Sequence, residues 1–266
     1  MPDIPPRRLI TTLYGLYARE RGNWLSVAGL VELMHELGVD AASVRSSVSR
    51  LKRRGVLLSD RRAGLAGYAL SPQTVEVLRE GDRRIWSRPR ATAEDGWLVV
   101  VFSVPESERD KRHTLRSTLQ RLGFGSVAPG VWVAPGTAYE EALATLDRLG
   151  LTGFTEFFRG DYLGGNVSAC VAEWWDLTEI ERLYGEFLRA FTPLRRVTPT
   201  PQRAFRSYVP MLTAWRRMPY LDPGIPLAHL PSRWKGDAAA GLFIELDASL
   251  REPAKRHARE LLGSAG

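Results

Sequence analysis

The chain has 266 residues and a net charge of +7. It contains no apolar run near the roughly 20 residues that a membrane-spanning helix needs, and residues 1–10 lack the apolar core of a signal peptide. The single cysteine, Cys170, excludes an intrachain disulfide and any metal site built from several cysteines. We therefore expect a cytoplasmic protein of two or three domains, with no membrane segment.

The excess positive charge lies at the N-terminal end of the chain. Residues 1–90 contain 16 Lys and Arg against 9 Asp and Glu, whereas residues 91–266 contain 21 of each class. A basic surface attracts nucleic acid, although a solvated basic face has the same composition. Charge alone therefore makes a polyanion only one of the possible partners of this region.

The N-terminal region predicts three short helices followed by a β-hairpin. Apolar residues at helical spacing predict helices over residues 7–20, 26–38 and 40–55, with Ser26 and Asp40 as N-caps. Two β-like segments around a glycine-containing turn follow the third helix. This order of elements is typical of a winged helix-turn-helix module.

The third predicted helix carries a narrow apolar stripe and a cationic, hydroxyl-rich outer face. Val44, Val48 and Leu51 form the stripe, so the opposite face points outward. In a winged helix this element enters the major groove, and the wing follows the DNA backbone. Serine and arginine side chains can bond base edges or phosphates. The candidates for base or nearby phosphate contact are Ser43, Arg45, Ser46, Ser47 and Ser49, and those for phosphate contact are Arg50, Lys52, Arg53, Arg61 and Arg62.

Residues 71–90 predict a last helix and a linker, and this helix is a possible dimerisation element. The region from 91 to 172 then alternates buried strand-like runs with helical patterns in the order βαββαβ, which predicts a ferredoxin-like sandwich. Such a unit has exposed sheet edges that can mediate dimerisation. Residues 173–266 are mainly helical, with proline-rich interruptions.

Four stretches resemble the PaaX-type repressors of bacterial phenylacetate degradation. They are "TTLYGLY", "VRSSVSRLKRRGVL", "SVPESERDKRHTLRSTLQRLGFGSVAPGVWVAP" and "YLDPGIPLAHLPSRWKGDAA". Leu16 and Ile225 depart from the family pattern, which has an acidic residue and a leucine at these places. The resemblance implies a homodimeric repressor that leaves its operator DNA when it binds phenylacetyl-coenzyme A or a related acyl-coenzyme A.

The resemblance also raises an enzymatic alternative, because the family's central domain is similar in fold to the small nuclease of CRISPR adaptation. That nuclease places a metal-binding aspartate at the end of its first strand. Here Ser103 and Pro105 stand at this place, and Mg²⁺ prefers carboxylate oxygens. Glu106, Glu108 and Asp110 follow at a helix start, where they complement the helix dipole. We therefore expect neither a metal nor a cofactor, and we expect no catalytic site.

The implied effector needs a pocket with an aromatic lining and cations at its mouth. One C-terminal region offers these residue types, and a free aromatic acid would fit them equally well. The candidate effector-binding residues are Arg206, Tyr208, Trp215, Arg216, Arg217, His229, Trp234 and Lys235.

The sequence thus predicts an α+β protein of three domains: a winged helix-turn-helix (1–90), a ferredoxin-like domain for dimerisation (91–172) and a helical effector-binding domain (173–266). The expected function is ligand-responsive repression at an inverted-repeat operator. Two alternatives stay open. The winged helix can dock a protein instead of DNA, and a metal-dependent nuclease is the weaker possibility.

Overall fold

A computed structural model describes residues 4–87, 90–196, 198 and 200–264 of the chain. The protein is a mixed α/β structure with two antiparallel sheets. It divides into two compact units. Unit 1 contains Met1–Trp86, Gly185–Arg216 and Asp237–Gly266, and unit 2 contains Ser87–Tyr184 and Arg217–Gly236. The grouping differs from three consecutive domains, because the C-terminal segment contributes to both units.

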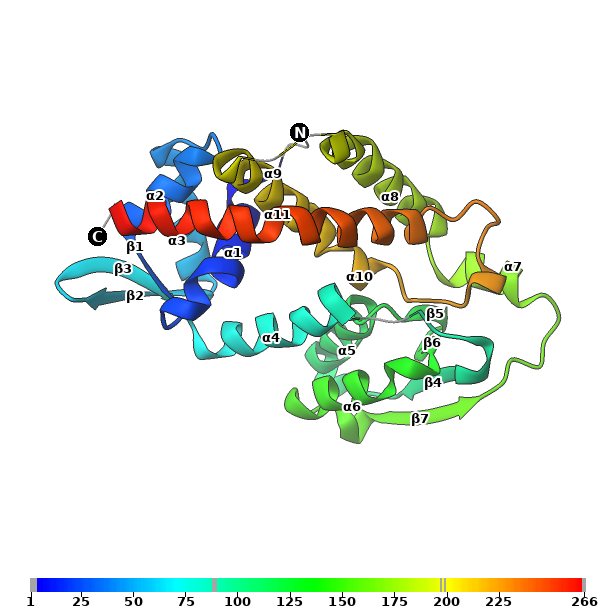
Figure 1. Cartoon of the computed structure of the whole chain (residues 1–266). Helices are drawn as coiled ribbons and strands as arrows, with labels where there is room; N and C mark the ends of the chain where they lie inside the picture. The colour runs from blue at the N-terminus through cyan, green and yellow to red at the C-terminus, as the bar shows by residue number, and fades with distance from the viewer. Residues whose placement is uncertain (1–3, 88–89, 197, 199, 265–266) are drawn as a thin grey trace. The chain divides into compact units, whose positions relative to one another are not determined.

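Unit 1 begins with three helices and a small sheet (Figure 1). Ser26 and Asp40 are the N-caps of the second and third helices, as predicted: they accept hydrogen bonds from the backbone N–H of Gly29 at 3.0 Å and of Ser43 at 2.9 Å. The sheet has the strand order β1-β3-β2. The elements are α1 (Pro6–Leu13), β1 (Trp24–Ser26), α2 (Val27–Glu36), α3 (Ala41–Arg53), β2 (Leu57–Arg62), β3 (Leu65–Leu70) and α4 (Pro72–Ser87).

Two C-terminal helices, α9 (Pro201–Trp215) and α11 (Gly236–Ser264), complete unit 1. Pro210 lies inside α9, which continues to Trp215. The Thr213 hydroxyl of α9 is hydrogen-bonded to the Thr12 hydroxyl of α1 at 2.8 Å. These helices therefore pack together with the N-terminal helices in unit 1.

More contacts join α9 and α11 to the N-terminal helices. Phe205 of α9 stacks on Tyr17, with 5.9 Å between the ring centroids. Arg206 of α9 binds the carboxylate of Glu36, at the end of α2, at 2.5 Å, and His257 of α11 lies 3.6 Å from the same carboxylate. The end of α2, directly before α3, is thus held by both C-terminal helices.

Unit 2 is built on a four-stranded antiparallel sheet with the order β5-β6-β4-β7. Two helices cover one face, where Leu98 and Val100 of the sheet pack against Leu115, Leu119 and Leu146. The elements follow the predicted βαββαβ order: β4 (Trp97–Phe102), α5 (Arg109–Arg121), β5 (Gly125–Ala128), β6 (Val131–Pro135), α6 (Tyr139–Arg148) and β7 (Thr155–Gly160).

The other face of this sheet is partly covered by α7 (Val167–Trp174) and by the segment around α10 (Met218–Leu221), with Trp175 and Ile225 buried against Val133. Arg90 anchors this segment through hydrogen bonds to the Ile225 carbonyl at 2.9 Å and to the buried carboxylate of Asp222 at 3.1 Å. Helix α8 (Leu177–Phe191) follows α7 in the chain. Residues 88 and 89 of the predicted linker lie outside the described residues.

Candidate nucleic-acid interface

The outer face of α3 is open to solvent. The apolar stripe of Val44, Val48 and Leu51 is buried, as the periodicity predicts. The opposite side carries most of the predicted DNA-contacting residues of this helix. Those that are exposed are Arg45, Ser46, Ser49, Arg50, Lys52 and Arg53, while Ser43 is half-buried.

Ser47 is the exception among the predicted contacts. Its side chain is fully buried, and its hydroxyl accepts a hydrogen bond from Arg50 Nη2 at 3.1 Å. Position 47 lies three residues after Val44 and four before Leu51, so it shares the inward face with the apolar stripe. The prediction that Ser47 contacts DNA is therefore wrong.

The first turn of α3 is organised around Asp40. The Ser43 hydroxyl donates to Asp40 Oδ2 at 2.6 Å, and the Ser43 backbone N–H donates to Oδ1 at 2.9 Å. These two bonds, the hydroxyl first, lower the pKa of Asp40. Ser43 thus serves as part of the helix cap, and its hydroxyl is already engaged.

The arginines of α3 differ in what they contact. Arg50 donates to the Ser46 hydroxyl at 2.8 Å, so these two side chains are held together along the outer face. Lys52 lies 5.7 Å from the centroid of the Tyr68 ring on the wing. In the described part of the chain, Arg45 and Arg53 have no carboxylate partner. Two cations of the outer face are therefore available to bind an external anion.

The wing formed by β2 and β3 carries the other two predicted phosphate contacts, and both are exposed. Arg61 donates to the Gly64 carbonyl at the turn, at 2.8 Å. Arg62 pairs with Asp60 at 2.9 Å and lies 5.7 Å from the centroid of the Trp24 ring. Arg61 is thus at the tip of the wing, whereas Arg62 joins the wing to β1.

The predicted effector-binding residues are distributed over both units. In unit 1, Arg206 pairs with Glu36, Tyr208 donates to Asp247 at 2.7 Å, and the buried Trp215 stacks on Phe243 with 4.6 Å between ring centroids. In unit 2, Lys235 pairs with Glu181 at 3.1 Å. The set divides into Arg206, Tyr208, Trp215 and Arg216 in unit 1, and Arg217, His229, Trp234 and Lys235 in unit 2.

In unit 2, two of these residues belong to aromatic clusters. His229 lies beside Trp97, with 6.1 Å between ring centroids, and Trp234 lies edge-on to Tyr184 at 5.8 Å.

In unit 1, burial is the main cause that raises the pKa of Tyr208, followed by its bond to Asp247. Core packing thus accounts for Tyr208 and Trp215, which are buried, whereas His229 and Trp234 are half-buried.

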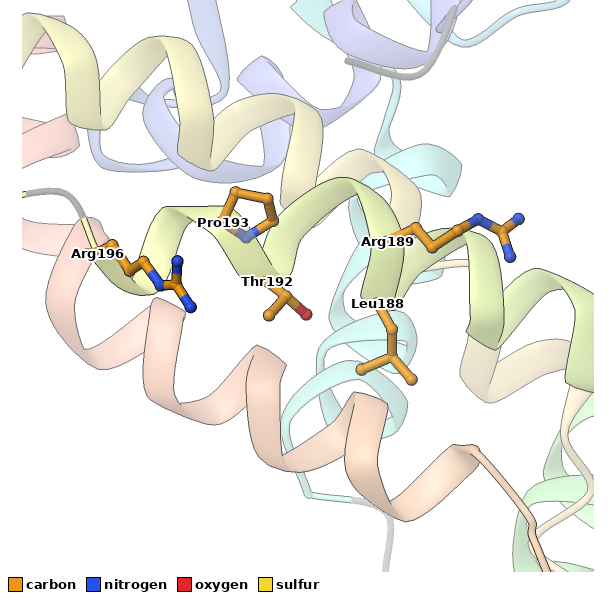
Figure 2. Close-up of a pocket in the computed structure, with 5 residues that line it drawn as sticks. All are labelled: Leu188, Arg189, Thr192, Pro193 and Arg196. Carbon is orange, nitrogen blue, oxygen red and sulfur yellow. The ribbon is translucent and has the colours of Figure 1, made fainter.

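A groove of about 470 Å³ lies at the C-terminal end of α8, a volume in the usual range for small-molecule sites. Leu188, Thr192 and Arg196 project from one side of this segment, and Arg189 extends away from them (Figure 2). Pro193 completes the lining. The groove combines an apolar surface with two guanidinium groups, yet it contains none of the predicted effector residues. No regular spacing in the sequence marks this groove, because Leu188 and Arg189 lie in α8 whereas Thr192, Pro193 and Arg196 lie in the 3-10 helix that follows it.

The acidic residues beside Ser103 are engaged in ion pairs. Glu106 pairs with Arg112 at 3.1 Å, and Glu108 pairs with Lys111. Across the described ranges, no group of three or more His, Cys, Asp or Glu side chains lies close enough to hold a metal ion. In the same residues, no helix combines the length and apolarity that crossing a bilayer requires.

Three models of one protein family match consecutive parts of the chain. The family description "PaaX-like protein" matches residues 6–74, "PaaX protein central Cas2-like domain" matches 90–172, and "PaaX-like protein C-terminal domain" matches 175–260. The chain is 27% identical over 251 residues to Transcriptional repressor PaaX of Escherichia coli (strain K12), covering 90% of this chain and 78% of that protein.

A similar fold occurs in uncharacterized protein Rv0674 from Mycobacterium tuberculosis. The TM-score is 0.57 at 18% identity, and the match covers 93% of this chain and 96% of the other. At this identity the likeness concerns the fold alone. The three consecutive family matches and the similarity to the Escherichia coli repressor lead to one conclusion: the chain belongs to the PaaX family.

Proposed function

We propose that this protein is a cytoplasmic transcription repressor that binds duplex DNA through α3 and the β2–β3 wing. We interpret α1–α3 and β1–β3 as a winged helix-turn-helix, and the sheet of unit 2 with α5 and α6 as a ferredoxin-like domain. The observation that carries the proposal is the open outer face of α3, where Arg45 and Arg53 have no carboxylate partner among the described residues. Membership of a family that includes a transcriptional repressor supports it.

The proposal includes a homodimer. One protomer presents one α3, so two copies related by a twofold axis would read an inverted repeat. Half-sites of this kind lie one helical turn of DNA apart, about 34–36 Å, or a multiple of it. The DNA site should therefore consist of two similar half-sites in opposite orientation.

The proposal also includes release by an effector. Phenylacetyl-coenzyme A, or another acyl-coenzyme A with an aromatic acyl group, has an apolar end and a polyanionic end. The groove at the end of α8 offers surfaces for both, through Leu188 and Pro193 on one hand and Arg189 and Arg196 on the other. Binding would favour a dimer conformation whose two α3 helices no longer match the half-site spacing.

Arg45→Ala and Arg61→Ala test the DNA-binding assignment. Arg45→Ala should lower the preference for the selected site over scrambled duplex by about 1–3 kcal/mol, because a bidentate arginine–guanine contact carries that much discrimination. Arg61→Ala should weaken binding to both duplexes alike and reduce the salt slope by about 0.9, because it loses one phosphate. Fluorescence anisotropy titrations at several salt concentrations measure both effects.

The same titrations distinguish the alternative functions. If wild-type affinity for DNA is weak and insensitive to salt, the winged helix docks a protein instead. Magnesium-dependent cleavage of the duplex would favour the nuclease reading. A normal sequence preference in Arg45→Ala would remove this residue from the base-reading set.

Effector release is tested on the preformed complex with DNA. Phenylacetyl-coenzyme A should lower the affinity for the selected duplex, and Arg189→Ala/Arg196→Ala should need at least about tenfold more ligand, because two charge-assisted contacts are lost. Trp234→Phe is the control, because Trp234 belongs to the effector residues predicted from the sequence and does not line the groove. Its ligand requirement should equal that of the wild type. Isothermal titration calorimetry gives the binding constants. Equal ligand affinity in the arginine variant would exclude the groove, and binding without loss of DNA affinity would exclude the release mechanism.

A further inference from the structure

The outward face of α5, in unit 2, carries a row of cationic and hydrogen-bond-donating side chains. Arg109, His113, Arg116 and Gln120 follow one another at intervals of three and four residues, and all four are exposed. Their spacing places them in one line along the helix. At 1.5 Å rise per residue the line is about 16 Å long.

Two other cations of the same helix are paired. Lys111 pairs with Glu108, and Arg112 pairs with Glu106. Within the described ranges, Arg109 and Arg116 have no carboxylate partner. On α3, Arg45 likewise has no carboxylate partner among the described residues. Some outward arginines of other helices are instead neutralised within their helix, as Arg182 is by Glu179 and Arg251 is by Asp247.

The chemistry of the row identifies its partner as a linear polyanion. Every group in it can donate a hydrogen bond to a phosphate oxygen, and arginine does so with two parallel bonds. A 16 Å line corresponds to about five base pairs at 3.4 Å each. A lipid surface is a poor fit, because membrane-binding helices insert an apolar face, and Leu115 and Leu119 of α5 are buried in the core.

We propose that the outward face of α5 is a second DNA-binding surface, which contacts phosphates and reads no bases. The inference rests on the proposed function, because it concerns DNA binding by the same repressor. The contribution of α5 is sequence-independent affinity, because its side chains add contacts to phosphates. Arg109 and Arg116 supply the charge, and His113 and Gln120 can donate further hydrogen bonds.

The test compares the full-length Arg109→Gln/Arg116→Gln variant with wild type on fluorescein-labelled 40-base-pair duplexes. One duplex is selected from random sequence by the wild-type protein, and the other is its scrambled version. The variant should reduce the slope of log affinity against log salt by about 2 on both duplexes, since each lost phosphate contact removes about 0.9. The ratio of the two affinities should stay at the wild-type value.

Arg203→Gln/Arg256→Gln is the matched control, because it removes two exposed charges from unit 1, and its salt slope should change less. Thermal melting establishes that the variants are folded. The inference is overturned if the α5 variant keeps the wild-type slope, changes no more than the control, or alters sequence preference. If wild-type DNA affinity itself is independent of salt, the proposed function fails instead. Loss of a protein partner with an unchanged DNA slope would show that α5 docks an acidic protein.

Discussion

Gly67→Ala should destabilise unit 1 by about 3 kcal/mol, near the upper end of the usual cost of overpacking, and should abolish DNA binding. A Cβ atom on this glycine would lie 2.3 Å from Cζ2 of Trp24 and 2.5 Å from the carbonyl oxygen of Leu25. Gly67 is in β3, the central strand, where it faces both Ser26 and Asp60. The backbone of β1 cannot move away without losing its pairing to β3. Urea unfolding and DNA titration measure the two losses.

Gly241→Ala is the matched control for this substitution. Gly241 also lies in unit 1, within α11, and a Cβ atom there meets no atom within 4 Å. Alanine is about 1 kcal/mol more favourable than glycine in a helix, so this variant should be as stable as wild type or more so. Equal urea midpoints for Gly67→Ala and wild type would contradict the packing described for β1 and β3.

Arg90→Ala should destabilise unit 2 by about 3 kcal/mol, because breaking a buried ion pair leaves a charge without its partner. The Asp222 side chain is only 7% exposed, and Arg90 lies 3.1 Å from it. The Tyr184 hydroxyl and the Gly224 N–H would still donate to this carboxylate, at 2.9 Å and 2.8 Å. These two neutral donors stabilise the Asp222 carboxylate less than the Arg90 cation does. Chemical denaturation monitored by tryptophan fluorescence gives the loss.

A second substitution separates the charge effect from lost packing. Arg90→Ala/Asp222→Asn removes the negative charge of Asp222 as well, and should recover part of the stability that Arg90→Ala loses. Arg182→Ala, which breaks an exposed pair with Glu179, should change stability by less than about 1 kcal/mol. If Arg90→Ala is as mild as Arg182→Ala, the buried pair does not stabilise the fold.

Local signals in the sequence predict much of the fold. Ser26 and Asp40 are caps that act within three residues of themselves, so their helices are visible without any tertiary information. The βαββαβ order of unit 2 follows from alternating periodicities in the same way. In contrast, β1 has three residues and exists because it pairs with β3, over 40 residues away. No local pattern identifies such a strand.

The errors at the candidate sites have a related cause. Ser47 has the polarity of an outward residue, but its position relative to Val44 and Leu51 turns it inward. Among the proposed effector residues, Tyr208 and Trp215 have the right chemistry for a ligand pocket, yet both are buried core side chains. Residue type indicates what a side chain can bind. Whether it faces a core or a ligand depends on partners that lie far away in the sequence.

The packing of α9 and α11 on α1 and α2 also determines whether an N-terminal fragment can fold without the C-terminal helices. A fragment ending near residue 90 would lose the contacts that Thr12 and Tyr17 make with Thr213 and Phe205 of α9. Residues 1–90 therefore do not form a compact unit without the C-terminal helices. A displacement of α11 would act on the end of α2 directly, through the contact of His257 with Glu36.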